Sequence, residues 1–347
     1  GGENNMLMHY AHGTGVMLDA AETDPAKRYK MVTKVEYAGG YNYMAVSWSA
    51  DGLSWSDMVK WPKYNPPAES HNFIFRDKKD GKFKVITRTW QNGLRLSSIC
   101  ESSDFINWSE PREILRGDGF GDQIYSMPVI QYEGIYLGFA SIFHEGNRSD
   151  ESFDCVDCEL TYATNPAHFN RVARGQSLIP RGSGHYPKGE FDCGCIYTAA
   201  PVEIDGKLCF YYMGGNGQHT NFRETVLARG FLEKDRFAYM QQLSPDRPAS
   251  IPISRVRIYD EALRILADIG EGGSLEAPIC PNRKAAPYEG YDYADCVMSP
   301  CGDGWLSIKF SKPFIDLGVK PTCLMLRFRN AKMYALEGDL ESESIRY

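Results

Sequence analysis

A repeat of about 53 residues runs through the first two thirds of the chain and limits its fold more than any other feature of the sequence. Strand-like runs in residues 27–49 are followed by the turn Ala50-Asp-Gly-Leu-Ser-Trp55. Equivalent runs in residues 81–100 are followed by the turn Ser103-Asp-Phe-Ile-Asn-Trp108. Two further copies lie at residues 133–169 and 205–237.

Each copy alternates Tyr, Val, Ile and Phe with other residues and is broken by Asp-Gly or Asn-Gly turns, without helical periodicity. Aromatic residues make up 13% of the chain, which agrees with a strand-rich fold. Repeats of this length built from short strands indicate the four-stranded blades of an all-β propeller. The aromatic residue after each Asp turn is predicted to pack between blades, at Trp55, Trp108 and Phe169.

The pattern changes near Pro245, Pro248 and Pro252, which mark a predicted domain boundary. Strand-like runs continue beyond it without the blade signature, at residues 254–259, 263–269, 304–310 and 322–328. Short runs between Gly, Pro and Asp turns are typical of a β-sandwich. We therefore predict a propeller over residues 1–245, which carries the activity, and a β-sandwich over residues 246–347.

The formal net charge of −7 and the lack of a dense Lys/Arg run argue against nucleic acid as a partner, because phosphate binding needs a concentrated positive face. Neither a long apolar segment nor a signal-like N-terminus is present, so we expect no membrane association. Together with reduced cysteines, this favours a cytoplasmic location.

Ten cysteines include the close pairs Cys155/Cys158 and Cys193/Cys195. Tetrahedral zinc needs two such pairs on short knuckle loops, whereas Cys193 and Cys195 would share one face of a strand. We therefore expect mostly reduced cysteines, no metal ligands among them and no cofactor. Carboxylates and waters of a funnel could still hold a hard cation.

Several motifs lie along almost the whole chain: Tyr29-Lys-Met31, Ser49-Ala-Asp-Gly-Leu-Ser-Trp55, Ser70-His-Asn72, Asp122-Gln-Ile-Tyr125, Phe191-Asp-Cys-Gly194 and Gly290-Tyr-Asp-Tyr-Ala-Asp-Cys296. With these motifs the chain resembles a group of bacterial proteins labelled glycosyl hydrolases, which are related to the five-bladed propellers of glycoside hydrolase families 32, 43 and 68. The resemblance implies a five-bladed β-propeller followed by a C-terminal β-sandwich, with carbohydrate bound in a central funnel.

Only four blade repeats are evident, whereas the resemblance implies five. Either the fifth blade is assembled from the termini and residues 238–260, or the propeller is incomplete in this chain. In the families with known chemistry, the first blade supplies the carboxylate that attacks the sugar or activates water.

The innermost strand of each propeller blade begins near the central axis, so residues at these starts are predicted to face the funnel. The predicted starts are Asn4-Asn5, Glu69-Ser-His-Asn72, Asp122-Gln-Ile-Tyr125 and Glu190-Phe-Asp-Cys-Gly194. Cleavage of a glycosidic bond needs one protonated and one ionised carboxylate. The candidate catalytic residues are therefore Asp192, Asp122, Glu69 and Glu190. Each could instead accept hydrogen bonds within its own turn.

Polar and aromatic residues near these starts and on neighbouring loops are candidates for binding a sugar, because hydroxyl groups need hydrogen bonds and pyranose faces stack on rings. They are Asn5, His71, Asn72, Arg88, Trp90, Tyr125, His144, Arg148 and His219. Solvent-facing loop positions would explain each of them equally well taken singly.

We therefore predict a glycosidase acting on a short glycan through a carboxylate acid/base pair. The alternative is a carbohydrate-binding propeller without catalysis, and a structural interaction propeller is a third possibility. The separation of the carboxylates across the funnel would discriminate the first two.

Overall fold

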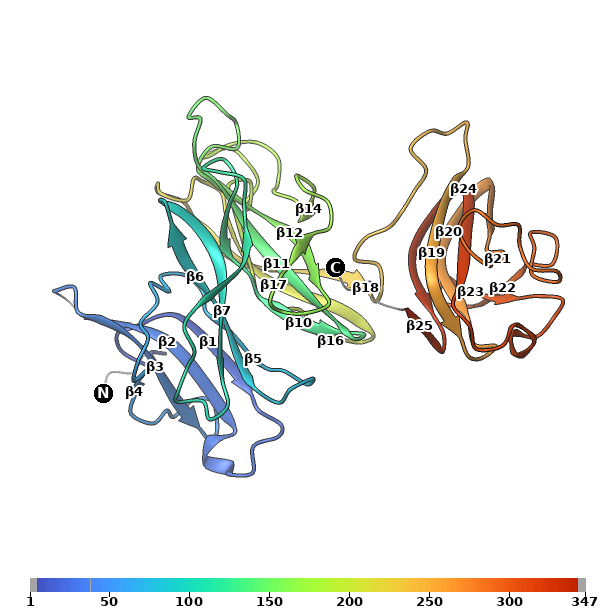
Figure 1. Ribbon diagram of the computed structural model, residues 1–347. Coiled ribbons are helices and arrows are strands. Elements are labelled where there is room, and N and C mark those ends of the chain that lie inside the picture. Colours follow the sequence, from blue (N-terminus) through green and yellow to red (C-terminus); the bar gives the residue numbers. More distant parts are fainter. Residues whose placement is uncertain (1–4, 38, 343–347) are drawn as a thin grey trace. The chain divides into compact units, whose positions relative to one another are not determined.

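The computed structural model describes residues 5–37 and 39–342, and over these residues the fold is all-β (Figure 1). The helical segments found there are two short 3-10 turns, Pro25–Lys27 and Phe314–Leu317. Among the described residues, no helix is long and apolar enough to cross a membrane. The all-β prediction is confirmed.

The chain divides into two compact units, residues 1–231 and 232–347. This division precedes the boundary predicted near Pro245. Met240, which lies between the two positions, exchanges backbone hydrogen bonds with Met333 of the second unit, at 2.9 and 3.0 Å.

The first unit begins with two separate four-stranded antiparallel sheets, each in simple sequence order. The first contains β1 (Ala11–Leu18), β2 (Tyr29–Glu36), β3 (Asn42–Ser49) and β4 (Val59–Lys60). The second contains β5 (Phe73–Arg76), β6 (Phe83–Gln91), β7 (Leu94–Ser102) and β8 (Arg112–Arg116). These are the first two blades, and the predicted repeat forms the middle hairpin of each.

The third and fourth blades share one hydrogen-bonded sheet, joined by a parallel pairing between Val156 and Cys195. The third contains β9 (Gln123–Ser126), β10 (Val129–Tyr132), β11 (Ile135–His144), β12 (Cys155–Ala163), β13 (Asn170–Arg171) and β14 (Ser177–Ile179). The fourth contains β15 (Cys195–Thr198), β16 (Val202–Ile204), β17 (Lys207–Gly215) and β18 (Thr225–Glu233). All four repeats predicted from the sequence are therefore blades.

The repeated turns have the structure that their residues predict. Asp51 Oδ1 accepts hydrogen bonds from the backbone NH groups of Leu53 and Ser54, at 2.8 and 2.7 Å. The equivalent Asp104 Oδ1 accepts from Ile106 and Asn107, at 2.9 and 2.7 Å. Side-chain acceptors thus close both turns in the same way.

Two of the three predicted aromatic wedges are buried between blades. Trp108 lies in the core shared by the first and second blades and stacks on Trp61, with ring centroids 4.9 Å apart. Phe169 lies in the core shared by the second and third blades. Trp55 is only half-buried, so its packing differs from that of its two equivalents.

Buried ion pairs recur at one end of the first two inner strands. Lys30 on β2 lies 3.2 Å from Asp19, which follows β1, and Lys84 on β6 lies 3.2 Å from Asp77, which follows β5. All four side chains are nearly inaccessible to solvent. In both blades a buried ion pair thus fixes the innermost strand to the second strand of the same blade.

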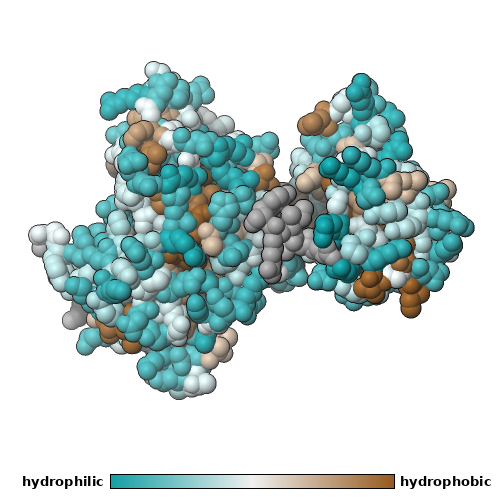
Figure 2. Space-filling view, viewed as in Figure 1, coloured by the Kyte–Doolittle hydropathy of each residue, from teal (hydrophilic) through white to brown (hydrophobic). Residues whose placement is uncertain are grey.

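The fourth blade leaves several apolar side chains exposed, including Leu227 and Phe231 on β18 and Met213 on β17. On the face drawn in Figure 2, hydrophilic residues dominate the surface and apolar residues form small groups. Completion of a fifth blade by residues 238–260 is wrong, because β19 (Ala249–Ile258) pairs with strands of the second unit. That the propeller has five blades stays a prediction, since the described residues form four.

The second unit is a single antiparallel sheet that curls around one core. Its strands follow the order β22-β23-β20-β24-β19-β25, and β21 also pairs with β24. Beyond β19 they are β20 (Arg264–Glu276), β21 (Ile279–Cys280), β22 (Val297–Gly302), β23 (Trp305–Lys309), β24 (Thr322–Glu337) and β25 (Leu340–Ser342). Irregularities in the pairing of β20 with β24, at Leu266/Ala267 and Ile269/Ser274, allow the sheet to bend over its core. This is the predicted β-sandwich.

Candidate functional site

The inner strands of successive blades lie side by side at their starts. The backbone NH and the Nδ2 of Asn72 donate to the carbonyl of Gly13, at 2.8 and 2.7 Å, which joins β5 to β1. Gly13 has φ +58° and lies so close that a β-carbon there would collide with the carbonyl of Ser70. The Ser70 hydroxyl donates to the carbonyl of Tyr125 on β9, at 2.9 Å. The segment that leads into β5 therefore contacts both β1 and β9.

A cavity of about 400 Å³ opens at these starts, and we call it the inner pocket. Its walls include His71, Tyr125, Tyr197, Tyr211, Tyr212 and Arg223. The Tyr125 and Tyr197 rings, from β9 and β15, have centroids 5.5 Å apart. The pocket thus combines aromatic faces with hydroxyl, imidazole and guanidinium groups, and its volume lies in the range of small-molecule sites.

His219 lies against the wall of this pocket. Its ring meets Tyr125 edge to face at 4.8 Å, and its Nδ1 lies 2.6 Å from the Tyr197 hydroxyl. Burial and the nearby charge of Arg223 lower the pKa of His219 to about 4, while burial raises the pKa of Tyr197. Near neutral pH the imidazole of His219 is therefore neutral, and its Nδ1 shares a hydrogen bond with the Tyr197 hydroxyl.

Two guanidinium groups lie beside the aromatic wall. The Arg88 guanidinium lies over the rings of Tyr125 and Trp90, at 4.7 and 5.4 Å. The Arg95 guanidinium lies over Trp90 and Phe143, at 4.5 and 4.6 Å. With Arg223, which lies 5.9 Å from the Tyr197 ring centroid, three cations surround this part of the first unit.

Carboxylates accompany two of these cations. Glu69 accepts a hydrogen bond from Arg88 at 3.3 Å and is half-exposed. Glu145 accepts from Arg95 at 3.0 Å and from Gln123 at 2.7 Å. The sequence predicts Glu69 as a site residue but misses Glu145, although its neighbour His144 is among the candidates.

The other predicted carboxylates have different surroundings. Asp122 accepts two bonds from Arg171, at 2.7 and 2.6 Å, and Arg171 also donates to Glu159. Ile124 on β9 packs in the core between the second and third blades, whereas Tyr125 lines the inner pocket. Asp122 therefore belongs to a charge cluster on β12 and β13.

Asp192 and Glu190 precede β15 and lie together. A β-carbon placed on Gly182 would collide with Oδ1 of Asp192 and Oε2 of Glu190. Asp192 accepts a hydrogen bond at 2.9 Å from the hydroxyl of Tyr212, which lines the inner pocket, and Glu190 accepts from the backbone NH of Ser183 at 2.6 Å. Asp192 thus borders the inner pocket through Tyr212.

The remaining predicted residues divide into two groups. Five gather at or beside the inner pocket: His71, Arg88, Trp90, Tyr125 and His219. Asn72 is fully buried and connects blades, and His144 lies between the carbonyl of Gly121 and Asp157. Asn5 and Arg148 are exposed, and Asn4 lies outside the described residues. Arg95, Tyr197 and Arg223 also lie at or beside the inner pocket. The sequence analysis missed them, because the repeat does not mark their positions.

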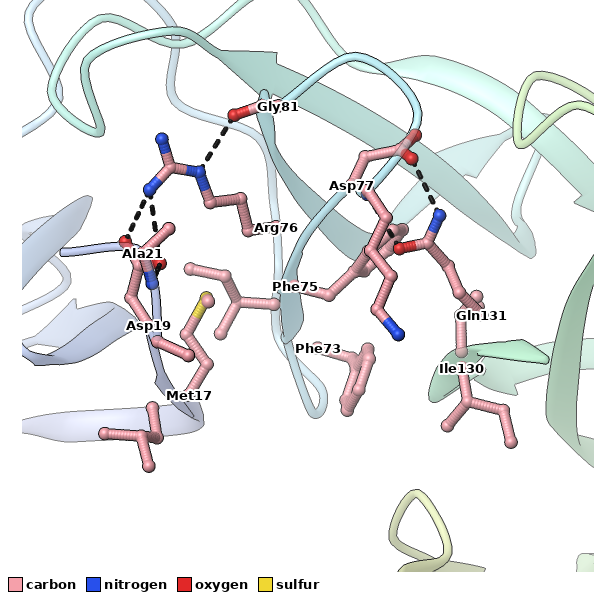
Figure 3. Close-up of a pocket in the computed structure, with 15 residues that line it drawn as sticks. Met17, Asp19, Ala21, Phe73, Phe75, Arg76, Asp77, Gly81, Ile130 and Gln131 are labelled. Carbon is pink, nitrogen blue, oxygen red and sulfur yellow. Dashed lines mark hydrogen bonds and ion pairs between the residues drawn. The ribbon is translucent and has the colours of Figure 1, made fainter. Parts of the chain in front are cut away.

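A second cavity, of about 630 Å³, is lined by residues from the ends of β1, β5 and β10 (Figure 3). Met17, Phe73, Phe75 and Ile130 give it an apolar surface. Its polar groups are paired with one another, since Arg76 binds Asp19 and Gln131 binds Asp77. This cavity therefore has fewer groups free to recognise a polar ligand.

All ten cysteines carry free thiols, and burial raises the pKa of Cys155, Cys193 and Cys195. Within the described ranges, no group of three or more His, Cys, Asp or Glu side chains is arranged to hold a metal ion.

No family model and no curated protein matches this chain. Among solved structures, the chain is similar to a glycosyl hydrolase from Bacteroides ovatus, with 12% identity and a TM-score of 0.43, over 64% of this chain and 65% of that one. It is also similar to the β-1,2-mannobiose phosphorylase of Listeria innocua, with 15% identity and a TM-score of 0.39, over 61% and 56%. The β-fructofuranosidase BmSUC1 of Bombyx mori matches with 12% identity and a TM-score of 0.39, over 89% and 77%. Such distant matches carry no inference about activity.

Proposed function

We propose that this protein is a glycoside hydrolase that binds its substrate in the inner pocket. The observation that carries the proposal is an aromatic cavity linked to two carboxylates: Asp192 binds Tyr212 of its wall, and Glu69 binds Arg88, which packs on Tyr125. Tyrosine rings supply faces for a sugar, His71 and Arg223 supply hydrogen-bonding groups, and Glu69 and Asp192 supply titratable groups from different blades.

We assign the acid/base pair to Glu69 and Asp192. Glu69 is half-exposed and so can exchange protons with solvent, while Asp192 is nearly buried and is oriented by the hydroxyl of Tyr212. Glycoside cleavage needs two carboxylates, one as acid and one as base, and in this proposal Glu69 and Asp192 supply them. Glu190 lies beside Asp192 and, in this proposal, positions it.

The test is hydrolysis of a panel of aryl glycosides and natural oligosaccharides by the intact chain. Glu69→Gln and Asp192→Asn should each lower turnover by at least about 10²-fold, the lower end of what a positioned acid or base contributes. Asp268→Asn is a matched control, because Asp268 also accepts from a tyrosine hydroxyl at 2.9 Å but lies in the second unit. Turnover that survives both pocket substitutions would show that the pair is misassigned.

Asp122→Asn belongs in the same series. The ion pairs of Asp122 with Arg171 support a structural role. Asp122→Asn should therefore lower the thermal stability of the chain and lower turnover by less than about 10²-fold. A loss of turnover of about 10²-fold without loss of stability would return Asp122 to the catalytic pair.

A second candidate is a carbohydrate-binding propeller without catalysis. It is favoured by the engagement of Glu69 with Arg88, because a carboxylate bound to a cation can serve in recognition without transferring protons. A measurable dissociation constant for a glycan, with no hydrolysis of that glycan by the wild-type chain, would select this candidate.

A further inference from the structure

Buried guanidinium groups near the inner pocket retain NH groups without partners. The described residues contain five buried side-chain nitrogen or oxygen atoms that lack a hydrogen bond, and four of them belong to Arg88, Arg95 and Arg223. Arg88 contributes both Nε and Nη1 and is 6% exposed. Buried donors without acceptors are costly, so their concentration at one place needs an explanation.

The carboxylates nearby do not satisfy these donors. Glu69 takes a single hydrogen bond from Arg88, through Nη2, and Glu145 takes one from Arg95, through Nη1. Arg223 donates from Nη1 to the main-chain carbonyls of Gln218 and His219. The free donors are thus left on the Nε atoms and on Nη1 of Arg88.

The positive charges of the three arginines also act on His219. Its pKa is lowered by burial first, then by Arg223, and further by Arg95 and Arg88, against the opposing effect of Asp154. All three arginines therefore act on one imidazole whose ring packs against Tyr125 of the inner pocket. The donors and the charge thus gather in one region, where Arg223 lines the inner pocket and Arg88 packs on Tyr125 of its wall.

We infer that the inner pocket recognises an anionic sugar, whose carboxylate or sulfate group is bound by Arg88, Arg95 and Arg223. Such a group offers the acceptors that the free NH groups lack, and the planar guanidinium matches its geometry. The tyrosine rings would hold the sugar ring to which the anion is attached. That the ligand is a sugar rests on the proposed function, whereas its charge rests on the arginines.

The test compares matched sugars with the intact chain by calorimetry: D-glucuronate and D-glucose 6-sulfate against D-glucose, and D-galacturonate and D-galactose 6-sulfate against D-galactose. At least one acid or sulfate should bind about 10-fold or more tightly than its neutral counterpart, as expected for charge-assisted hydrogen bonds. The anion that binds more tightly shows whether the pocket recognises a carboxylate or a sulfate group. In NMR titrations the same anion should raise the pKa of His219 from about 4, and the neutral sugar should not.

Arg223→Gln and Arg88→Gln should each remove most of this preference. Arg264→Gln is the control, because Arg264 also pairs with a glutamate, Glu337, and lies 4.6 Å from a Trp305 ring centroid, but in the second unit. Since Arg88 is buried, circular dichroism must show that its variant folds, and Arg223→Gln supplies the test if it does not.

Equal binding of charged and neutral sugars, no binding of any acid or sulfate at millimolar concentration, or a preference that survives Arg223→Gln would overturn the inference. Hydrolysis of neutral glycosides without preference for charged ones would overturn it and keep the hydrolase proposal. Selective anion binding without hydrolysis of any glycoside would support the inference and overturn the hydrolase proposal.

Discussion

The repeat places Trp55 and Trp108 at equivalent positions, yet the structure packs them differently, and this difference gives a quantitative prediction. Trp108 is 5% exposed, stacks on Trp61 and meets Phe105 edge to face at 5.7 Å, whereas Trp55 is half-buried. A buried Trp removes about 200 Å² from water, which at ~25 cal/mol/Å² gives roughly 5 kcal/mol. Trp108→Ala should therefore lower the free energy of unfolding by about 3–5 kcal/mol, and Trp55→Ala by about half as much.

Urea unfolding followed by far-UV circular dichroism measures both variants, and avoids fluorescence because the substitutions remove fluorophores. The chain has two compact units, so the transition that shifts must be assigned to the first unit, and the second unit supplies an internal reference. A Trp108→Ala variant within about 1 kcal/mol of wild type would refute the wedge role. Equal losses for the two variants would show that Trp55 is packed as tightly as Trp108.

Two further predictions concern charge. Lys84→Met should destabilise the first unit by about 3–5 kcal/mol, because it leaves Asp77, which is 2% exposed, without its cation, and unchanged thermal stability would contradict this. His144 should stabilise the fold more in acid than in base: burial lowers its pKa, but the hydrogen bond and charge of Asp157 outweigh burial and the opposing charge of Arg181, so the pKa is raised. That stabilisation is complete below the ordinary pKa of about 6.5 and is lost as the pH rises through the raised value. The difference in unfolding free energy between wild type and His144→Gln should thus shrink from about pH 5.5 to pH 8.5, and a constant or growing difference would refute the assignment.

The sequence predicts the blades because each repeat contains its own strands, turns and wedge. Asp51 and Asp104 close their turns by local hydrogen bonds, which the residue pattern alone defines. The starts of β5, β9 and β15 could likewise be found by their place in the repeat, whereas β1 begins at Ala11, later than the predicted start at Asn4-Asn5. What a repeat cannot predict is the direction of a single side chain, which depends on partners far along the chain.

Asp122 and Arg223 illustrate this limit. Asp122 stands at a predicted strand start, but its partner Arg171 comes from a later strand of the same blade. Arg223 lies in the loop between β17 and β18 and lines the inner pocket from there. Convergence of residues from several blades is a property of the assembled propeller, so only those at equivalent positions could be predicted.

Lys84 and Arg88 lie on the same strand, β6, but their charges are paired in different ways, and this contrast separates stability from function. Lys84 contacts Asp77, Asp80 and Glu101, and so its charge is fully balanced inside the blade. Arg88 is as deeply buried, but the carboxylate that it binds is the half-exposed Glu69, and two of its donors lack a hydrogen bond. Arg88→Met should therefore cost the fold much less than Lys84→Met, because the carboxylate that it leaves behind is in contact with water. Comparable losses of thermal stability in these two variants would mean that Arg88 is a structural cation, and smaller losses for Arg88→Met are expected if its buried donors are kept for a ligand.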